Sequence, residues 1–172
     1  MNFLLKRFIH SLPAPRVLKN KILYEYIHEC SGTPSYGDVI FCRRYISAYK
    51  HFGIYIGSGK VIHFAPRDIG SEADIHETTI EDFADGNTVY IMDFPKKYEC
   101  GSFLRYIVHK DEYQLQSPQQ TVERARMLIG KKGIDGDEYN FLVNNCENFA
   151  IWCKTNVAES RQVNSWIDSI MP

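Results

Sequence analysis

The stretch Lys50-His51-Phe52-Gly53-Ile54-Tyr55-Ile56-Gly57-Ser58-Gly59-Lys60-Val61-Ile62-His63-Phe64 predicts a β-hairpin. Two runs rich in Ile, Val, Tyr and Phe flank the turn residues, and Gly59 can supply the positive φ that a bulged turn needs. His51 and His63 stand near the two outer ends of this hairpin, twelve residues apart. The pattern therefore places two titratable rings among apolar strand residues.

Periodicity on either side of the hairpin predicts an α+β fold, with a small antiparallel sheet packed against helices. A helical stripe of apolar residues begins after Pro118 and stops at Gly130, and a second one follows the N-cap Asn145 as far as Val157. A shorter helix is predicted over 160–171. The predicted strands are 38–42, 51–57, 60–65 and 88–94.

Length, composition and charge predict one main domain, residues 36–172, preceded by a basic head, residues 1–35. The chain has 172 residues, of which 44% are hydrophobic, and a net charge of −1 without any long basic run, so nucleic acid is not an expected partner. The charged residues within 1–24 are all basic. Two short amphipathic helices are expected in residues 1–27, and two roles stay open for them: transient contact with an anionic membrane surface, or packing on the core.

The predicted location is the cytoplasm, with peripheral contact at membranes as an option. No run of 18 apolar residues occurs, and the start of the chain does not match a secretion signal. Reduced thiols are therefore expected. The cysteines are Cys30, Cys42, Cys100, Cys146 and Cys153.

No cofactor and no metal ion is predicted. The Gly57–Lys60 turn continues into Val61 and lacks the pattern of a phosphate-binding loop, and neither a G-x-S-x-G nor an H-E-x-x-H motif is present. The segment 135–138, Asp-Gly-Asp-Glu, resembles a calcium loop but lacks its third acidic position and the distant Glu.

Cys146 is the candidate nucleophile. With Asn145 as N-cap, its sulfur stands in the first turn of a helix, where the positive end of the dipole favours a thiolate. The helical stripe turns the thiol toward the sheet, and the neighbouring carboxylate of Glu147 opposes ionisation, so a base is needed. His51 and His63 are the candidates for that base. The other cysteines are expected to be small buried hydrophobes, and the remaining histidines, His10, His28, His76 and His109, to be surface side chains.

Three blocks of sequence together resemble the family of lecithin:retinol acyltransferase and its relatives, also called the NC-domain family. They are Tyr36-Gly37-Asp38-Val39-Ile40, the hairpin quoted above, and Asn145-Cys146-Glu147-Asn148-Phe149-Ala150, so the similarity spans residues 36–157. The resemblance implies a circularly permuted papain-like fold. It also implies that Cys146 is the nucleophile, that His51 is the general base and that His63 orients the His51 ring, with the backbone N–H of Cys146 in the oxyanion hole.

Strand geometry sets a condition on this catalytic group. In a regular hairpin that turns at Ser58-Gly59, His63 pairs with Ile54, which puts the two rings on opposite faces of the sheet and about 10 Å apart. The resemblance therefore requires a bulge or a sharply coiled strand, which we predict near Lys50-His51.

The expected function is that of a cysteine-dependent acyltransferase or phospholipase, which acts on an acyl lipid or a small acyl donor through an acyl-thioester on Cys146. Two alternatives stay open. The first is a cysteine peptidase or amidase of the same clan. The second is a non-catalytic module that binds a membrane or a protein.

Overall fold

Antiparallel pairing organises the chain, whose computed structural model describes residues 32–44, 49–94, 96, 110–134 and 145–158. The five strands are arranged in the order β4-β3-β2-β1-β5. The predicted helices of residues 1–27 and 160–171 lie outside the described residues, as does most of the predicted head. The strands are β1 (Val39–Arg44), β2 (Tyr49–Gly57), β3 (Lys60–Pro66), β4 (Ala73–Thr79) and β5 (Val89–Met92).

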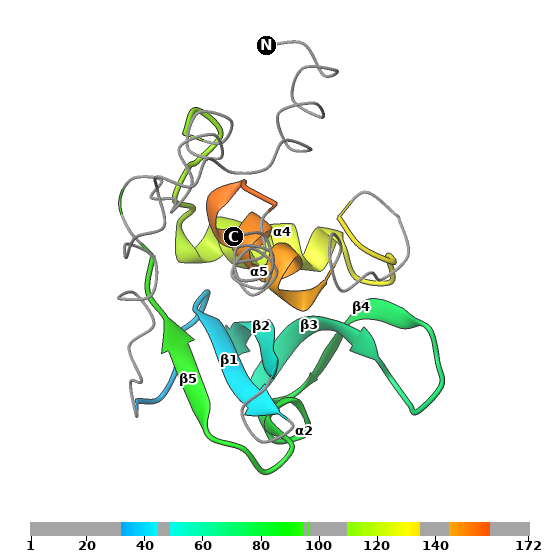
Figure 1. Ribbon diagram of the computed structural model, residues 1–172. Helices are drawn as coiled ribbons and strands as arrows, with labels where there is room; N and C mark the ends of the chain where they lie inside the picture. The colour runs from blue at the N-terminus through cyan, green and yellow to red at the C-terminus, as the bar shows by residue number, and fades with distance from the viewer. Residues whose placement is uncertain (1–31, 45–48, 95, 97–109, 135–144, 159–172) are drawn as a thin grey trace, which may run out of the picture.

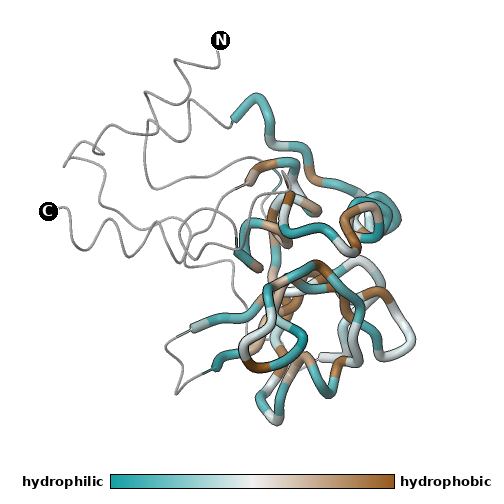
Figure 2. Tube along the Cα trace, turned by 90° about the vertical axis from the view of Figure 1, so that its right-hand side faces the viewer, coloured by the Kyte–Doolittle hydropathy of each residue, from teal (hydrophilic) through white to brown (hydrophobic). Residues whose placement is uncertain are grey.

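The two faces of the sheet carry separate apolar clusters, because side chains alternate along each strand. Phe41, Phe52 and Ile62 belong to the larger cluster, under helices α4 (Pro118–Met127) and α5 (Cys146–Thr155). The smaller cluster, which includes Cys42 and Val61, packs against Phe83 of the short helix α2 (Ile80–Ala84). Figure 1 shows α4 and α5 on one side of the sheet and α2 on the other. Figure 2 shows brown, hydrophobic stretches and teal, hydrophilic stretches along the described part of the chain.

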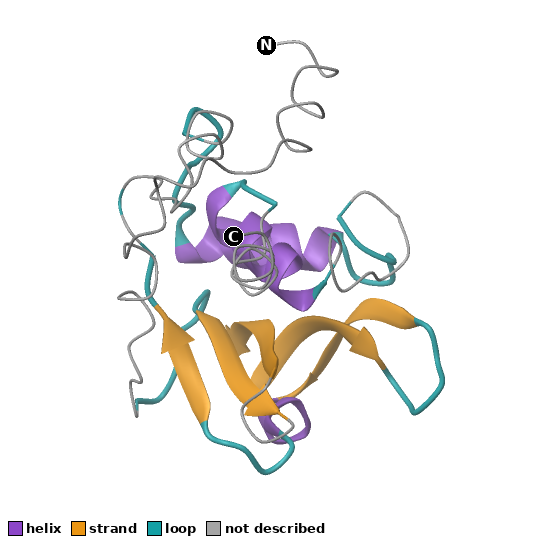
Figure 3. Ribbon diagram, viewed as in Figure 1, coloured by secondary structure: helices purple, strands orange, loops and turns teal. Residues whose placement is uncertain are grey.

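The α+β fold predicted from the sequence is confirmed, since helices cover a small antiparallel sheet (Figure 3). The four predicted strands are present with slightly different ends. Strand β4 and helix α2 were not predicted. Ile75 is the one large aliphatic residue of β4, whose other members are polar or small, so the strand gives little hydrophobic periodicity.

Helix α4 holds α5 in place against the sheet. Ser117 and Gln120 form a capping box at the start of α4. Pro118 takes the first position of the helix, where proline is favoured. The helix ends at Met127, earlier than the predicted end near Gly130. Arg124 stacks over the ring of Trp152 at 3.8 Å and donates a hydrogen bond to the carbonyl of the same residue. This cation–π contact and hydrogen bond join the two helices next to the core.

The hairpin between β2 and β3 differs from the predicted register by one residue. Ser58 and Gly59 both have positive φ, as a tight turn with primed geometry requires. A bulge between Tyr55 and Gly57 then shifts the pairing, so that His63 lies opposite Gly53. The predicted pairing of His63 with Ile54 was therefore wrong, and so was the predicted position of the bulge near Lys50-His51. Gly53, the residue opposite His63, is two positions from His51, so the shift places the two histidine rings on the same face of the sheet.

Candidate active site

The thiol of Cys146 lies at the first position of α5, between this helix and the sheet. The side chain of Asn145 caps this helix and accepts hydrogen bonds from the backbone N–H groups of Glu147 and Asn148 at 2.9 and 3.0 Å. Cys146 is completely buried in the helix-side core. Two predictions are thereby confirmed, namely the Asn cap and a thiol that faces the sheet.

Strands β2 and β3 separate next to this thiol. Their ladder ends at the pair Gly53–His63, although β2 begins as early as Tyr49 and β3 runs on to Pro66. The sulfur of Cys146 lies 2.8 Å from the hydroxyl oxygen of Tyr49, and the backbone N–H of Phe52 also donates to it. The thiol thus contacts one residue of β2 before His51 in the sequence and one after it, next to the point where β2 and β3 stop pairing.

Burial raises the pKa of the Cys146 thiol to about 11. The hydroxyl of Tyr49 and the backbone N–H groups of Phe52 and Glu147 act in the opposite direction, because each donates a hydrogen bond that favours the thiolate. The Glu147 carboxylate raises the pKa further, as its position in the sequence suggested. The thiolate expected from the helix terminus is therefore not the resting form, since desolvation outweighs the dipole.

His51 and His63 meet directly on the opposite face of the sheet, the one that α2 covers. Nε2 of His51 lies 2.7 Å from Nδ1 of His63, and both side chains are buried. The ring of Phe83 packs on both of them, with centroid distances of 5.1 and 5.6 Å. Burial is the main reason why the pKa of His51 is well below 6.5 and that of His63 falls to about 3, with neighbouring histidines adding to it. Both rings are accordingly neutral near pH 7.

Gly53 makes room for Val61 and for Phe83, the ring that packs on both histidines. A Cβ atom at Gly53 would lie 2.6 Å from Cγ1 of Val61 and 2.9 Å from the Phe83 ring. We expect Gly53→Ala to lower the free energy of unfolding by on the order of 2 kcal/mol, because the core must shift to admit the methyl group. Urea denaturation measures the change. Gly32→Ala is the control, since no atom lies within 4 Å of a Cβ at Gly32, and an equal loss in the two variants would contradict the explanation.

The sequence-predicted residues are thus placed in two groups. His51 and His63 are hydrogen-bonded to each other, whereas the side chain that is hydrogen-bonded to Cys146 is that of Tyr49. Among the described residues, no hydrogen bond joins Cys146 directly to His51. The roles of nucleophile, general base and orienting group stay predictions.

Tyr49 is a site residue that the sequence analysis missed. It stands two positions before His51 in β2, so the spacing groups it with that ring, 6.4 Å away between centroids, but gives no signal of its contact with Cys146. Its hydroxyl can donate to the sulfur as negative charge develops there. We expect Tyr49→Phe to raise the thiol pKa further and to slow alkylation of Cys146 by iodoacetamide several-fold at any pH below that pKa. Peptide mapping of the alkylated protein measures this, and an unchanged rate would contradict it.

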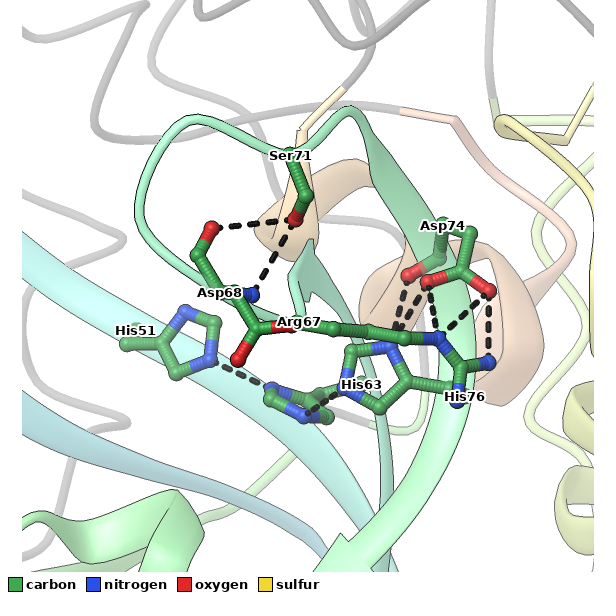
Figure 4. A network of polar contacts seen from close by, with 7 residues as sticks. All are labelled: His51, His63, Arg67, Asp68, Ser71, Asp74 and His76. Atoms are coloured by element: carbon green, nitrogen blue, oxygen red, sulfur yellow. Dashed lines mark hydrogen bonds and ion pairs between the residues drawn. The ribbon is translucent and has the colours of Figure 1, made fainter.

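His76 corrects a further expectation, because this predicted surface residue is 7% exposed. It pairs with His63 across β3 and β4, and the two Nε2 atoms are 3.0 Å apart. Figure 4 shows the resulting row of three imidazoles, which ends at Asp74. Unpredicted strand β4 carries His76, which explains why the sequence placed it in an irregular segment. His10, His28 and His109 lie outside the described residues.

The remaining expectations concern thiols, ions and membranes. Cys42 and Cys153 are buried as predicted, while Cys30 and Cys100 lie outside the described residues. The part of the chain that the structure describes contains no group of three His, Cys, Asp or Glu side chains arranged to hold a metal ion. The calcium-like segment 135–138 is outside it. Over the same described ranges, none of the helices has both the length and the apolar character needed to cross a bilayer.

Comparison with known proteins gives one family and several relatives. The family model described as lecithin retinol acyltransferase matches residues 32–159. Human phospholipase A and acyltransferase 1 is 28% identical over 149 residues, which cover 81% of this chain and 78% of the relative. Human phospholipase A and acyltransferase 3 is 28% identical over 138 residues, 78% of each chain. Bovine lecithin retinol acyltransferase is 23% identical over 158 residues, 78% of this chain and 60% of the relative.

Proposed function

Because the chain belongs to the lecithin retinol acyltransferase family, we propose that it is a cysteine-dependent acyltransferase or phospholipase whose nucleophile is Cys146. The names of its relatives suggest the acyl ester of a phospholipid as the donor. The α+β architecture is consistent with the papain-like fold of the family. The family supports the substrate class, and the chemistry has to come from the residues of the site.

One observation supports the proposal most. A thiol at the start of α5 contacts β2 at Tyr49 and Phe52, on either side of a neutral imidazole whose Nε2 is already bound to a second imidazole. Nδ1 of His51 is then the nitrogen that can take up the thiol proton, across the place where β2 and β3 separate. This combination of nucleophile, base and orienting ring is what thiol acyl transfer requires.

The proposed reaction has two halves. In the first, the sulfur of Cys146 attacks the ester carbonyl carbon while its proton passes to His51, and the lysolipid alcohol leaves with that proton. In the second, water, an amine or an alcohol attacks the carbonyl carbon of the acyl-thioester while its proton passes to His51. The C–S bond then breaks, the acyl group leaves bonded to the attacking atom, and the proton on His51 returns to the sulfur. The backbone N–H of Cys146, at the start of a capped helix, is the proposed oxyanion donor.

The resting pair is a neutral thiol and a neutral imidazole. Moving a proton from a thiol with a pKa of about 11 to an imidazole with a pKa below 6.5 costs at least about 6 kcal/mol. We therefore infer that His51 acts as a general base during the attack, rather than by holding a thiolate in advance. Burial is the main cause of the high pKa of the Cys146 thiol. A substrate that enters the site and contacts the thiol changes the surroundings of the sulfur, and with them this pKa.

Intact-mass spectrometry after incubation with phosphatidylcholine tests the proposal. We expect an acyl adduct on the wild type and none on Cys146→Ala. Cys153→Ala is the matched control, since Cys153 is also buried in α5 but lies two turns away from the site. Absence of an adduct with several phospholipids would contradict the proposal. Cleavage of peptides but not lipids would favour a peptidase or amidase, and no cleavage of either would favour a binding module.

We also propose a cytoplasmic location with transient membrane contact through residues 1–27. The support is the charge of that segment, since its charged residues up to position 24 are all Lys or Arg. We expect sedimentation with liposomes that contain phosphatidylserine to weaken as salt rises and to be lost on deletion of residues 1–27. Binding that salt does not change would contradict an electrostatic role for the segment.

A further inference from the structure

Three histidines from neighbouring strands form one continuous row. His51 of β2, His63 of β3 and His76 of β4 are joined by Nε2–Nδ1 and Nε2–Nε2 distances of 2.7 and 3.0 Å (Figure 4). All three are buried. His76 and His63 are direct cross-strand partners, so the row follows from the register of β3 and β4.

The far end of the row fixes where the protons are. Nδ1 of His76 lies 3.0 Å from the backbone carbonyl of Asp74 and 3.1 Å from its carboxylate. Both of these groups are acceptors, so Nδ1 of His76 carries a hydrogen and donates it. Arg67 holds the same carboxylate through two of its nitrogens, which keeps the acceptor in place. A neutral His76 then presents an unprotonated Nε2 to His63.

The rest of the row follows by the same rule, since a neutral imidazole has one donor and one acceptor nitrogen. Nε2–H of His63 donates to Nε2 of His76, and Nδ1 of His63 is consequently an acceptor. Nε2–H of His51 donates to that acceptor, which leaves Nδ1 of His51 without a hydrogen. The acceptors at Asp74 thus determine, through two intervening rings, which nitrogen of His51 carries the proton.

We propose that His76, held by Asp74, is a positioning residue that keeps Nδ1 of His51 unprotonated and ready to receive the thiol proton. This inference rests on the proposed function of Cys146 and His51, and extends it by two residues that the family resemblance does not include. A reversed row would block the reaction. If Nε2 of His76 carried the hydrogen, His63 would donate to His51 and the proton of His51 would stand on Nδ1.

Charges around the row agree with this direction. The guanidinium of Arg44 donates to the carbonyl of Phe83 and disfavours a proton on His63 and on His51. Asp74 has the opposite effect on His63, and Arg67, which forms an ion pair with that carboxylate, has a smaller effect in the same direction as Arg44. The negative charge of Asp74 is therefore at the His76 end, and the positive charge of Arg44 adds to burial in keeping the His51–His63 pair neutral.

Long-range ¹H–¹⁵N correlation spectra of the full chain test the proton positions without any assay of activity. We expect His51 and His63 as Nε2–H tautomers and His76 as the Nδ1–H tautomer, in the wild type and in Cys146→Ala alike. In His76→Phe, which removes the acceptor, we expect His63 and His51 to show mixed tautomers. His51 found as Nδ1–H in the wild type would overturn the proposal, and this measurement does not need any variant to fold.

Kinetics of lipid deacylation give a second, independent test. We expect His76→Phe to lower kcat by about 10- to 100-fold with little change in KM, because the wrong tautomer removes the base but not the binding site. His76→Gln keeps an acceptor for His63 and should recover most of that loss. Glu77→Gln is the control, since it breaks an exposed ion pair to Lys60 between the same two strands.

The two levels of the proposal fail in different ways. Expected tautomers without any Cys146-dependent acyl chemistry would refute the proposed function and leave the hydrogen-bonded row intact. Cys146-dependent chemistry with a kcat that His76→Phe does not change would overturn the positioning role of His76. Equal losses in His76→Phe and His76→Gln would also overturn it, because a purely structural role would explain them.

Discussion

Replacing His51 with Gln is expected to lower kcat for lipid deacylation by about a thousandfold, as loss of a general base does. The amide of Gln reaches the position of the imidazole Nε2 and can keep the hydrogen bond to His63. The packing on Phe83 is largely kept as well. The variant therefore removes proton transfer with the least disturbance of the core. Fatty acid release from phosphatidylcholine measures the rate.

A double variant separates catalysis from folding in this experiment. If Cys146 and His51 act as one unit, then His51→Gln in the Cys146→Ala background should cause no further loss. Lys60→Gln provides the control on the same hairpin, because its ion pair with Glu77 is exposed and contributes little to stability. A folded His51→Gln protein with activity within tenfold of the wild type would exclude His51 as the base.

The hairpin shows how much of the site the sequence could predict. The apolar runs and the turn residues fix two strands, and three motif blocks in the right order identify the family around Cys146, His51 and His63. The register was not predictable in the same way, since a single extra residue between Tyr55 and Gly57 leaves no mark in the hydrophobic pattern. That one residue decides whether His63 faces His51 or the other side of the sheet.

The parts that were missed depend on contacts between distant segments. Strand β4 is held by its pairing with β3 rather than by its own apolar residues, so His76 was placed at the surface. The pKa of Cys146 depends on burial under the sheet, which outweighs the local effect of the helix terminus. Local motifs therefore identified three residues of the candidate site, and tertiary packing determined which side chains meet there and how they are protonated.

Acidification is expected to destabilise the protein strongly in the range between the pKa values of His51 and His63 in the unfolded and folded states. The pKa of His63 is about 3 in the fold against 6.5 in the unfolded chain, so below about pH 6.5 the unfolded state binds more protons. Stability then falls as pH falls. Between about pH 7 and about pH 5, His63 alone accounts for about 2 kcal/mol, and His51 contributes with the same sign.

Urea denaturation at these two pH values measures this loss, and a matched variant assigns it. The carboxyl pKa of Asp74, which Arg67 keeps below 3.8, contributes only at lower pH. We expect His63→Gln to show an acid sensitivity smaller by about 2 kcal/mol, because Gln does not titrate and can keep hydrogen bonds to both neighbouring rings. An equal loss in the variant and the wild type would mean that other groups cause it. In that case, the buried neutral pair of His51 and His63 would not be what acid disrupts first.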